Sequence, residues 1–411
     1  MLRLTDWALT REELYATVFG FSWLDVLLIL WLLWQLIYGL NAGLVVALGG
    51  LAGFIAGAVG AFFAAPFVSQ LAPSPGWRTV MVIGATVLLI AIGHGVGMKL
   101  GRAIGRHVKS DSIRSVNRIL GGVLNVAVGA LVISMLSFGV SNLGIPVVAK
   151  ALSDSQVISR IDDWTPKPVK EAVAQVRSLV LDEGIPALLN PDGPNVEVAA
   201  PNADTNTDAW NAAAESVMKI SGTAFQCGQN QTGTGFVISP GRVLTNAHVV
   251  AGVSMPVVQT QKQGALPARV VYFDASHDMA ILAVDSLEAQ PLATAATVPG
   301  NTVTAFAGYP LGGPLQVRAA TVLSSAPMMV PDVTDGATTL LDVYQLAGNV
   351  QSGNSGGPLL DSDGDVVGVI FAKATSTNNV GFALTMEEVN PVIAAAPHLS
   401  SAVPSGSCKV G

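Results

Sequence analysis

Hydrophobic positions follow two different patterns along this chain. The first third holds four long apolar segments, at about residues 23–40, 43–68, 79–98 and 119–140. Each has about 18 residues or more, and a helix that rises ~1.5 Å per residue needs roughly 20 residues to cross a hydrocarbon core ~30 Å thick. The pattern therefore predicts four membrane-spanning helices. The first segment is too long for a cleaved signal peptide, and another span follows it almost at once.

The loops between these segments differ in charge. The loop between the second and third segments holds only Arg78, whereas the loop between the third and fourth holds six basic residues against one acid, Asp111. The basic residues are Lys99, Arg102, Arg106, Lys109, Arg114 and Arg118. Because basic loops are retained in the cytoplasm, this loop is expected to be cytoplasmic. With four spans, the amino terminus and everything after residue 140 then lie outside.

Small and polar residues occur inside the apolar segments. Glycines repeat at every fourth position over 49–57 and 93–105, which predicts helices whose backbones approach closely. Asp25, His94 and Asn125 lie in or near the segments, where a polar group can mark a transport path. Their places near helix ends or between helices favour structural roles instead.

Residues 141–208 connect this region to the rest of the chain. Valines at helical spacing predict a surface or juxtamembrane helix over 167–181. Residues 190–208 are rich in Pro, Asn and Asp, which is typical of an extended, flexible linker. The predicted division is a four-span membrane domain at 1–140, a helix and linker at 141–208, and a third domain at 209–411.

Short apolar runs replace the long segments after residue 209. They lie at 217–221, 233–239, 242–250, 267–273, 279–284, 301–309 and 366–372, separated by Gly, Pro, Asp and Asn. This spacing favours an all-β sandwich or a pair of barrels over alternating strands and helices. About 200 residues are enough for two small barrels.

Composition supports a membrane location for part of the chain. Of 411 residues, 50% are hydrophobic and 12% are charged, which is too apolar for one ordinary soluble protein. No basic tract indicates nucleic-acid binding. Cys227 and Cys408 have no further cysteine or histidine at metal-ligand spacing, so we expect no metal site and no cofactor. A single long-range disulfide between the two is left open.

Three polar residues of the β region have the side chains that nucleophilic catalysis needs. His248 lies at the end of one apolar run, Asp278 directly precedes another, and Ser355 lies in the turn GNSGGP at 353–358. A serine hydroxyl is a weak nucleophile that needs an imidazole to take its proton and a buried carboxylate to hold the imidazole. Glycines in the turn let two backbone N–H groups converge on an oxyanion. Together these features predict a catalytic triad.

Purely structural roles for these residues are the alternative to a catalytic triad. Taken singly, each of the three segments is typical of a strand end, a cap or a turn. His277 adjoins Asp278, but neighbours on a strand point to opposite faces, which disfavours a bond between them. Asp274 and Asp285 are alternative acids, and His398 lies in no motif, so we expect it to be structural or exposed. The conjunction of all three segments favours catalysis.

The segments TNAH, D-x-A-I-L and GNSGGP resemble the signature segments of trypsin-like serine proteases of the chymotrypsin clan, including bacterial HtrA-type enzymes. The resemblance implies a double β-barrel in which His248 is the general base, Asp278 orients it and Ser355 is the nucleophile. It also implies an oxyanion hole formed by the N–H groups of Gly353 and Ser355. A strand that pairs with substrate is expected at residues 378–384.

Two departures from the family pattern shape the expected regulation. Digestive enzymes of this clan carry an aspartate before the serine, where this chain has Asn354, so we expect no charge-triggered zymogen switch. The residues after Ser355 are too few for the PDZ domain that HtrA-type proteases carry. Substrate selection is therefore expected from the protease groove, the membrane tether or a partner.

The amino-terminal region resembles the colicin V production protein family in hydropathy and glycine pattern. The whole architecture is similar to actinobacterial membrane-anchored serine proteases associated with acid resistance. That resemblance implies a catalytic domain in the periplasm, protein or peptide substrates there or in the cell wall, and a part in acid or oxidative stress. Cys227 and Cys408 fit an oxidising compartment, in which a disulfide would join them.

The resulting hypothesis is a multi-pass protein of the cell membrane that carries an extracytoplasmic serine endopeptidase. Its expected partners are the lipid bilayer and protein substrates, with no nucleic acid. The alternative is a membrane transporter or scaffold whose β domain binds peptides without cleaving them. The number of spans supports that alternative, because one span would suffice as an anchor.

Overall fold

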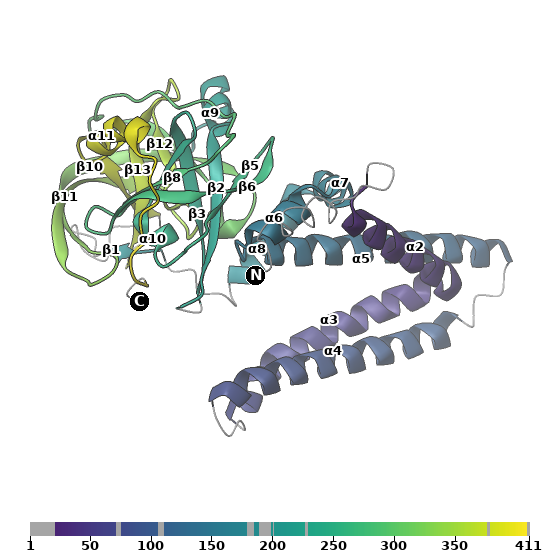
Figure 1. The fold of residues 1–411 in the computed structure, drawn as a ribbon. Helices are drawn as coiled ribbons and strands as arrows, with labels where there is room; N and C mark the ends of the chain where they lie inside the picture. The colour runs from purple at the N-terminus through teal and green to yellow at the C-terminus, as the bar shows by residue number, and fades with distance from the viewer. Residues whose placement is uncertain are drawn as a thin grey trace, which may run out of the picture. The chain divides into compact units, whose positions relative to one another are not determined.

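The computed structural model describes residues 21–70, 75–105, 111–178, 185–188, 199, 201–226, 229–375 and 379–408 (Figure 1). The chain forms two compact units. The first comprises Met1–Ser134 and Ser155–Ile161, and the second comprises Met135–Asp154 and Asp162–Gly411. The predicted domain boundaries at residues 140 and 208 stay predictions.

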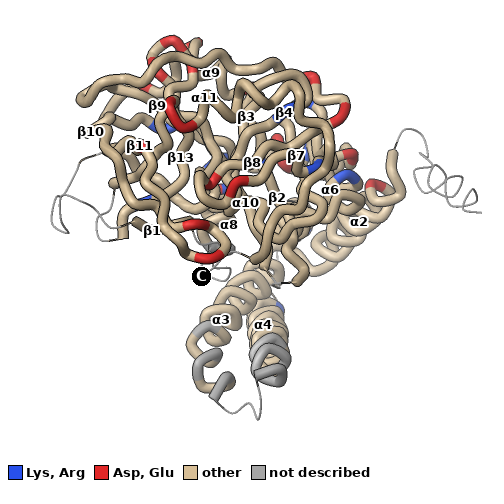
Figure 2. Tube along the Cα trace, turned by 60° about the vertical axis from the view of Figure 1, so that its left-hand side comes forward, with Lys and Arg blue, Asp and Glu red and all other residues tan. Residues whose placement is uncertain are grey.

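Four long apolar helices form the amino-terminal part, as predicted. They are α2 (Trp23–Ala42), α3 (Leu44–Gln70), α4 (Pro75–Gly105) and α5 (Asp111–Ser141). Each contains a stretch long and apolar enough to cross a membrane. The tube in Figure 2 is almost free of charged positions along the described parts of α3 and α4. Such helices expose apolar side chains all round, which suits lipid rather than water.

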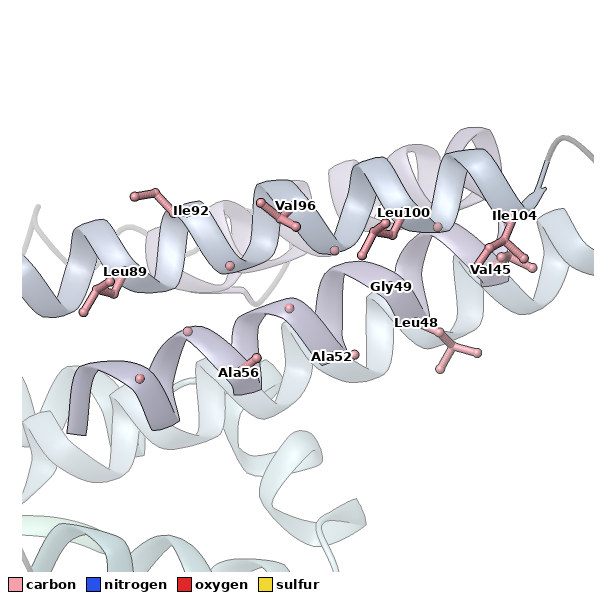
Figure 3. A pocket seen from close by; sticks show the side chains of 16 residues that line it. Val45, Leu48, Gly49, Ala52, Ala56, Leu89, Ile92, Val96, Leu100 and Ile104 are labelled. Atoms are coloured by element: carbon pink, nitrogen blue, oxygen red, sulfur yellow. The ribbon is translucent and has the colours of Figure 1, made fainter. Parts of the chain in front are cut away.

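The repeated glycines bring α3 and α4 into backbone contact. A Cβ atom added at Gly97 would lie 2.0 Å from the carbonyl oxygen of Gly49, and one added at Gly53 would lie 2.1 Å from that of Gly93. Only glycine allows this approach. Apolar side chains beside the contact, including Leu48, line an open groove of about 760 Å³ (Figure 3).

Polar side chains of the first unit bond to nearby helix ends and backbone. The buried carboxylate of Asp25 accepts from the N-cap residue Ser22, and also from the hydroxyl of Ser155 at 2.5 Å and the N–H of Val157 at 3.0 Å, at the start of α7 (Gln156–Trp164). It therefore caps two helices. Nδ1 of His94 lies 3.0 Å from the carbonyl oxygen of Gly50. Asn125 donates to the carbonyl of Gly121 in its own helix.

The connecting region contains more ordered structure than its composition indicates. It holds α6 (Pro146–Ser153), α7, α8 (Lys167–Ser178), a short strand β1 (Ala187–Leu188) and α9 (Asp208–Ala214). The helix predicted at 167–181 begins at Lys167 as expected, while residues 179–181 lie outside the described residues. Most of the linker predicted at 190–208 also lies outside them. β1 lies in a segment where no strand was expected.

Two seven-stranded sheets form the rest of the second unit. The first has the order β6-β5-β2-β3-β4-β8-β7. Its strands are β2 (Val217–Ala224), β3 (Gln229–Ser239), β4 (Arg242–Thr245), β5 (Val257–Thr260), β6 (Gly264–Pro267), β7 (Arg269–Asp274) and β8 (Met279–Ala283). All pairings among the described residues of this sheet are antiparallel.

The second sheet has the order β1-β13-β12-β9-β10-β11-β14, and pairing of β13 with β14 closes it into a barrel. Its other strands are β9 (Val303–Gly308), β10 (Gln316–Pro331), β11 (Thr338–Ala347), β12 (Pro358–Leu360), β13 (Val366–Ala374) and β14 (Val380–Thr385). Antiparallel sheets that bend into barrels match the predicted fold class, which is confirmed.

Short helices complete the unit. They are α10 (Ala247–Val250), η1 (Pro310–Gly312), α11 (Met386–Ala395) and η2 (Ala396–His398). Within the run at 242–250, β4 ends at Thr245 and α10 follows, so His248 lies directly after a strand. Asn246 occupies the N-cap position of α10 without a side-chain capping bond, and its amide donates to the carbonyl of Asp278 instead.

One hydrophobic core joins the two sheets. Phe236, Leu244 and Ile281 of the first sheet lie in the same buried cluster as Phe371 and Phe382 of the second. Burial of such large side chains is the main favourable contribution to folding. This shared core holds the two sheets of the second unit against each other.

We predict that enlarging a contact glycine weakens the helical hairpin. Gly97→Leu should lower the free energy of unfolding in detergent by about 1–3 kcal/mol, because the side chain cannot fit against the α3 backbone. Helix circular dichroism during titration with a denaturing detergent measures this. Gly95→Leu is the matched control, since a Cβ at Gly95 has no atom within 4 Å. Equal losses for both substitutions would contradict the packing described.

Candidate active site

One buried carboxylate holds the imidazole of His248. This residue lies in α10, directly after β4. Its Nδ1 is 2.7 Å from Oδ2 of Asp278, and its backbone N–H donates to Oδ1 of the same carboxylate at 2.9 Å. Both side chains are buried. Two contacts to one carboxylate fix the orientation of the ring and leave Nε2 as the nitrogen that can serve a nucleophile.

The backbone around Asp278 is specialised for this contact. Asp278 ends the turn between β7 and β8 with a φ of 50°, a left-handed conformation that aspartate and asparagine tolerate better than most residues. Its carbonyl accepts a hydrogen bond of 2.8 Å from Nδ2 of Asn246, which precedes α10. This bond ties the loop that carries the carboxylate to the loop that carries the imidazole.

Ser355 lies in a turn that only glycine can form at two positions. Gly353 and Gly356 have φ values of 88° and 82°. An added Cβ would lie 2.3 Å from the carbonyl oxygen of Tyr309 in the first case and 2.1 Å from that of Thr234 in the second. Larger residues at these positions would therefore meet both backbone strain and a steric clash.

The neighbouring Asn354 is fully buried, and its Oδ1 accepts a hydrogen bond of 2.9 Å from the N–H of Gln351. A neutral amide thus stabilises the turn, where the digestive enzymes carry a charge. The absence of a charge-triggered switch stays a prediction.

The three predicted catalytic residues line one cleft of about 560 Å³. The hydroxyl of Ser355 is buried and has no hydrogen-bond partner among the described residues. A buried hydroxyl without a partner is costly unless another group joins it. The cleft thus holds a hydroxyl, an imidazole and a carboxylate, the three groups that acyl transfer by a serine uses.

Two backbone N–H groups are available at the turn. The N–H of Asn354 donates to Gln351 and that of Gly356 donates to Ile370. The N–H groups of Gly353 and Ser355, in contrast, donate to no acceptor in the part of the chain that the structure describes. These are the two donors predicted for an oxyanion hole, which needs N–H groups that no other oxygen occupies.

Thr234 of β3 holds this turn from the opposite sheet, and sequence reasoning missed it. Its N–H donates to the carbonyl of Ser355 at 2.8 Å, and its hydroxyl donates to the carbonyl of Gly353 at 2.6 Å. The hydroxyl also accepts from the N–H of Tyr309 at 3.0 Å. Thr234 therefore binds the carbonyls of both residues whose N–H groups are predicted to form the oxyanion hole. The available signal was a threonine set between Gly233 and Gly235 in a strand.

A carboxylate on the rim gives the cleft a negative charge. Asp332 lines the cleft. Burial acts to raise the pKa of its carboxyl, but hydrogen bonds from Thr334, Asp335 and Ser276 outweigh that effect and lower the pKa below its usual value. The group is therefore ionised at neutral pH, which disfavours acidic side chains nearby.

The competing residues pair elsewhere. Nδ1 of His277 is 2.9 Å from Oδ2 of Asp274, and this pair is partly exposed. Asp285 forms an exposed ion pair of 2.7 Å with Arg269, whose hydrogen bond lowers the pKa of the carboxyl. His398 lies in η2. No group of three or more metal-ligating side chains occurs among the described residues.

The expected position of the substrate-pairing strand is wrong. Residues 380–384 of the predicted segment 378–384 form most of β14, and residue 378 lies outside the described residues. β14 pairs with β11 over Val380–Leu384 and with β13 over Gly381–Thr385, so both of its edges are taken. A strand needs an unpaired edge to accept another chain. Closure of the barrel, which the sequence does not reveal, removes that edge.

The predicted disulfide involves one cysteine outside the described residues and one within them. Cys227 lies outside the described residues, whereas Cys408 lies within them. The pairing of the two cysteines stays a prediction.

Comparison with known families agrees with this geometry. Residues 233–369 match the trypsin-like peptidase domain, and residues 24–166 match the colicin V production protein family. Both resemblances stated from the sequence are thus confirmed. The fold and these matches define the class as a trypsin-like peptidase joined to an amino-terminal domain of apolar helices.

Individual relatives narrow the class to one family. Serine protease Rv3671c of Mycobacterium tuberculosis is 32% identical over 375 residues, which cover 90% of this chain and 94% of the relative. The crystal structure of its protease in the active form is 36% identical, with a TM-score of 0.50 over 55% of this chain and 100% of the solved chain. Putative serine protease HhoA of Synechocystis is 27% identical over 296 residues, 67% of this chain and 68% of the relative. This chain belongs to the Rv3671c family and is a serine protease.

We predict that the hydroxyl of Thr234 supports the reaction without taking part in it. Thr234→Val should lower kcat for peptide hydrolysis by about tenfold to a hundredfold, because loss of its bond to Gly353 displaces the turn. Steady-state kinetics on a peptide substrate measures this. Thr304→Val is the matched control. The hydroxyl of Thr304 is also buried and bonds to the carbonyl of Ala320 within the second sheet, and Thr304 does not line the cleft. A similar loss in both variants would assign Thr234 to stability alone.

Proposed function

We propose that this protein is a membrane-anchored serine endopeptidase whose catalytic residues are His248, Asp278 and Ser355. The observation that carries the proposal is the buried double contact between His248 and Asp278 beside the cleft that Ser355 also lines. Such a contact has little use in a domain that only binds peptides. It is the arrangement that keeps an imidazole ready to accept a proton.

The reaction follows from the roles of the three side chains. Nε2 of His248 takes the proton from the Ser355 hydroxyl as Oγ attacks the carbonyl carbon of the scissile peptide bond. The carboxylate of Asp278 stabilises the imidazolium that forms. His248 then gives the proton to the leaving amine, and an acyl-enzyme remains on Ser355. Water, deprotonated by His248, attacks this ester, and the serine returns to its starting state.

The N–H groups of Gly353 and Ser355 are proposed to bind the oxygen that becomes negative during attack. Support comes from Thr234, which binds the carbonyls of Gly353 and Ser355, while the two N–H groups have no acceptor among the described residues. N–H groups that are already in position need not reorient when the negative charge develops, so no free energy is lost to reorganisation at that step. Their contribution is larger in a buried cleft than in water.

The four apolar helices are proposed to span the membrane, with the protease domain outside the cytoplasm. Support comes from the excess of basic residues over 99–118, at the end of α4, the start of α5 and the segment between them, because basic loops remain cytoplasmic. The lipid bilayer is then one partner, and the substrates are proteins or peptides in the periplasm or cell wall. A role in acid or oxidative stress resistance, which the family resemblance implies, belongs to the same proposal.

A disulfide between Cys227 and Cys408 is proposed for this oxidising location. It would connect the loop between β2 and β3 to the carboxyl-terminal tail. Closing so long a loop is worth on the order of 5 kcal/mol in the chain-entropy description.

A fluorophosphonate probe tests the catalytic assignment in the full-length protein. We predict labelling that disappears in Ser355→Ala and falls by about 100-fold or more in His248→Ala, because the hydroxyl then lacks its base. In-gel fluorescence measures it. His277→Ala is the matched control and should label normally, since this histidine pairs with Asp274 away from the triad. Absence of labelling in the folded, oxidised protein would favour the scaffold alternative.

Topology mapping tests the membrane arrangement. An epitope tag after Gly411 should be accessible to antibody on spheroplasts, whose cytoplasmic membrane is intact. A tag inserted at 106–110 should become accessible only after that membrane is permeabilised. Immunofluorescence before and after permeabilisation measures both. The reverse pattern would place the protease domain in the cytoplasm and contradict the proposal.

A further inference from the structure

A short strand from the connecting region lies on the edge of β13. β1 pairs parallel with the last residues of β13, Ala187 beside Lys373 and Leu188 beside Ala374. The N–H of Lys373 donates to the carbonyl of Pro186 at 3.1 Å. The N–H and hydroxyl of Thr375 both donate to the carbonyl of Leu188, at 2.9 and 3.3 Å. Main-chain bonds of this kind bind any extended peptide.

This edge of β13 also carries the turn that contains Ser355. The N–H of Gly356 donates to the carbonyl of Ile370 at 2.7 Å, and the N–H of Ile370 donates to the carbonyl of Gly357 at 2.9 Å. β14 occupies the other edge of β13. Val369 pairs with both β12 and β14, and Lys373 pairs with both β1 and β14. Since a strand has two edges, β12 and β1 lie on the same edge, which the turn also shares. A peptide on that edge therefore lies next to the proposed nucleophile.

The same segment forms part of the cleft wall. Residues 185–188 line the cleft together with His248 and Ser355. Ile185 and Leu188 are 7% and 5% exposed, whereas Ala187 between them is exposed. Leu188 belongs to the same buried cluster as Phe371 and Val330, which also line the cleft. The segment is thus held through its backbone and through two aliphatic side chains.

We propose that residues 185–188 are a resident occupant of the peptide-binding edge, and that substrates displace them by presenting an extended segment with aliphatic side chains. This inference rests on the proposed protease function. A tethered segment competes at an effective concentration of up to about millimolar. Because only the fraction of molecules with an open edge binds substrate, the occupant raises the apparent KM. It does not alter kcat, since the triad is unchanged once substrate is bound.

Kinetics of the full-length protein on fluorescently labelled casein tests this. Leu188→Ala is expected to lower KM by about threefold or more with kcat unchanged, because the weakened occupant leaves the edge open more often. Leu292→Ala is the matched control, as Leu292 packs against the same buried cluster but does not line the cleft. It should leave KM unchanged. An unchanged KM in Leu188→Ala, or equal changes in both variants, would overturn the inference.

Peptide competition tests the aliphatic preference without relying on the stability of a variant. Acetyl-Ile-Pro-Ala-Leu-amide should inhibit casein hydrolysis competitively, more strongly in Leu188→Ala than in the unaltered protein. Acetyl-Ile-Pro-Ala-Asp-amide should inhibit neither. Equal inhibition by the two peptides, or by neither, would overturn the preference.

Two further outcomes separate this inference from the function on which it rests. Fluorophosphonate labelling of Ser355 with an unchanged KM would retain the protease and reject the occupant. Absence of both labelling and hydrolysis in every variant would reject the proposed function and the occupant with it. A cut after Leu188 that mass spectrometry finds in the unaltered protein and not in Ser355→Ala would show the segment to be a substrate, and would also overturn the inference.

Discussion

The hydrogen bonds of Thr234 are the interaction on which the site depends, because they cross between the two sheets. His248 and Asp278 belong to loops of the first sheet, whereas Ser355 belongs to a turn of the second. Thr234 lies in β3 of the first sheet and bonds to both carbonyls of the Ser355 turn. Its own carbonyl accepts from the hydroxyl of Thr245, at the end of β4. A chain of hydrogen bonds thus runs from the segment that precedes His248 to the turn that contains Ser355.

In both compact units, glycine allows the backbone to lie against other backbone atoms, with a different result in each. Between α3 and α4 it lets two backbones touch, as at Gly49 and Gly97, where the surroundings offer no water to drive association. At Gly353 and Gly356 it allows a left-handed turn that packs against backbone carbonyls. In the first case the gain is contact between helices. In the second it is the freedom of two N–H groups.

The edge of β13 links the cleft to the connecting region. Closing a barrel removes most strand edges, and β14 shows this because both of its sides are paired. The stretch of β13 beyond the Ser355 turn is the part that receives β1. Unpaired edges attract extended chains whether or not these are substrates. An intramolecular strand at this place satisfies the backbone groups of the edge and buries apolar side chains that would otherwise face water.

Local signals in the sequence were sufficient for the four apolar helices, the β-rich second half and the three candidate catalytic residues. Apolar length, short alternating runs and the glycine-lined serine turn each depend on residues near one another in the chain. The roles of Thr234 and Asn246, the pairing of both edges of β14 and the position of β1 depend on contacts between residues far apart. Residues that are neighbours in the sequence do not predict which carbonyl a buried hydroxyl will bind, or which strand edge stays unpaired when a barrel closes. The residue types alone thus specify which chemical groups are available, whereas the fold specifies which of them meet, because hydrogen bonds across two sheets exist only after both sheets have folded.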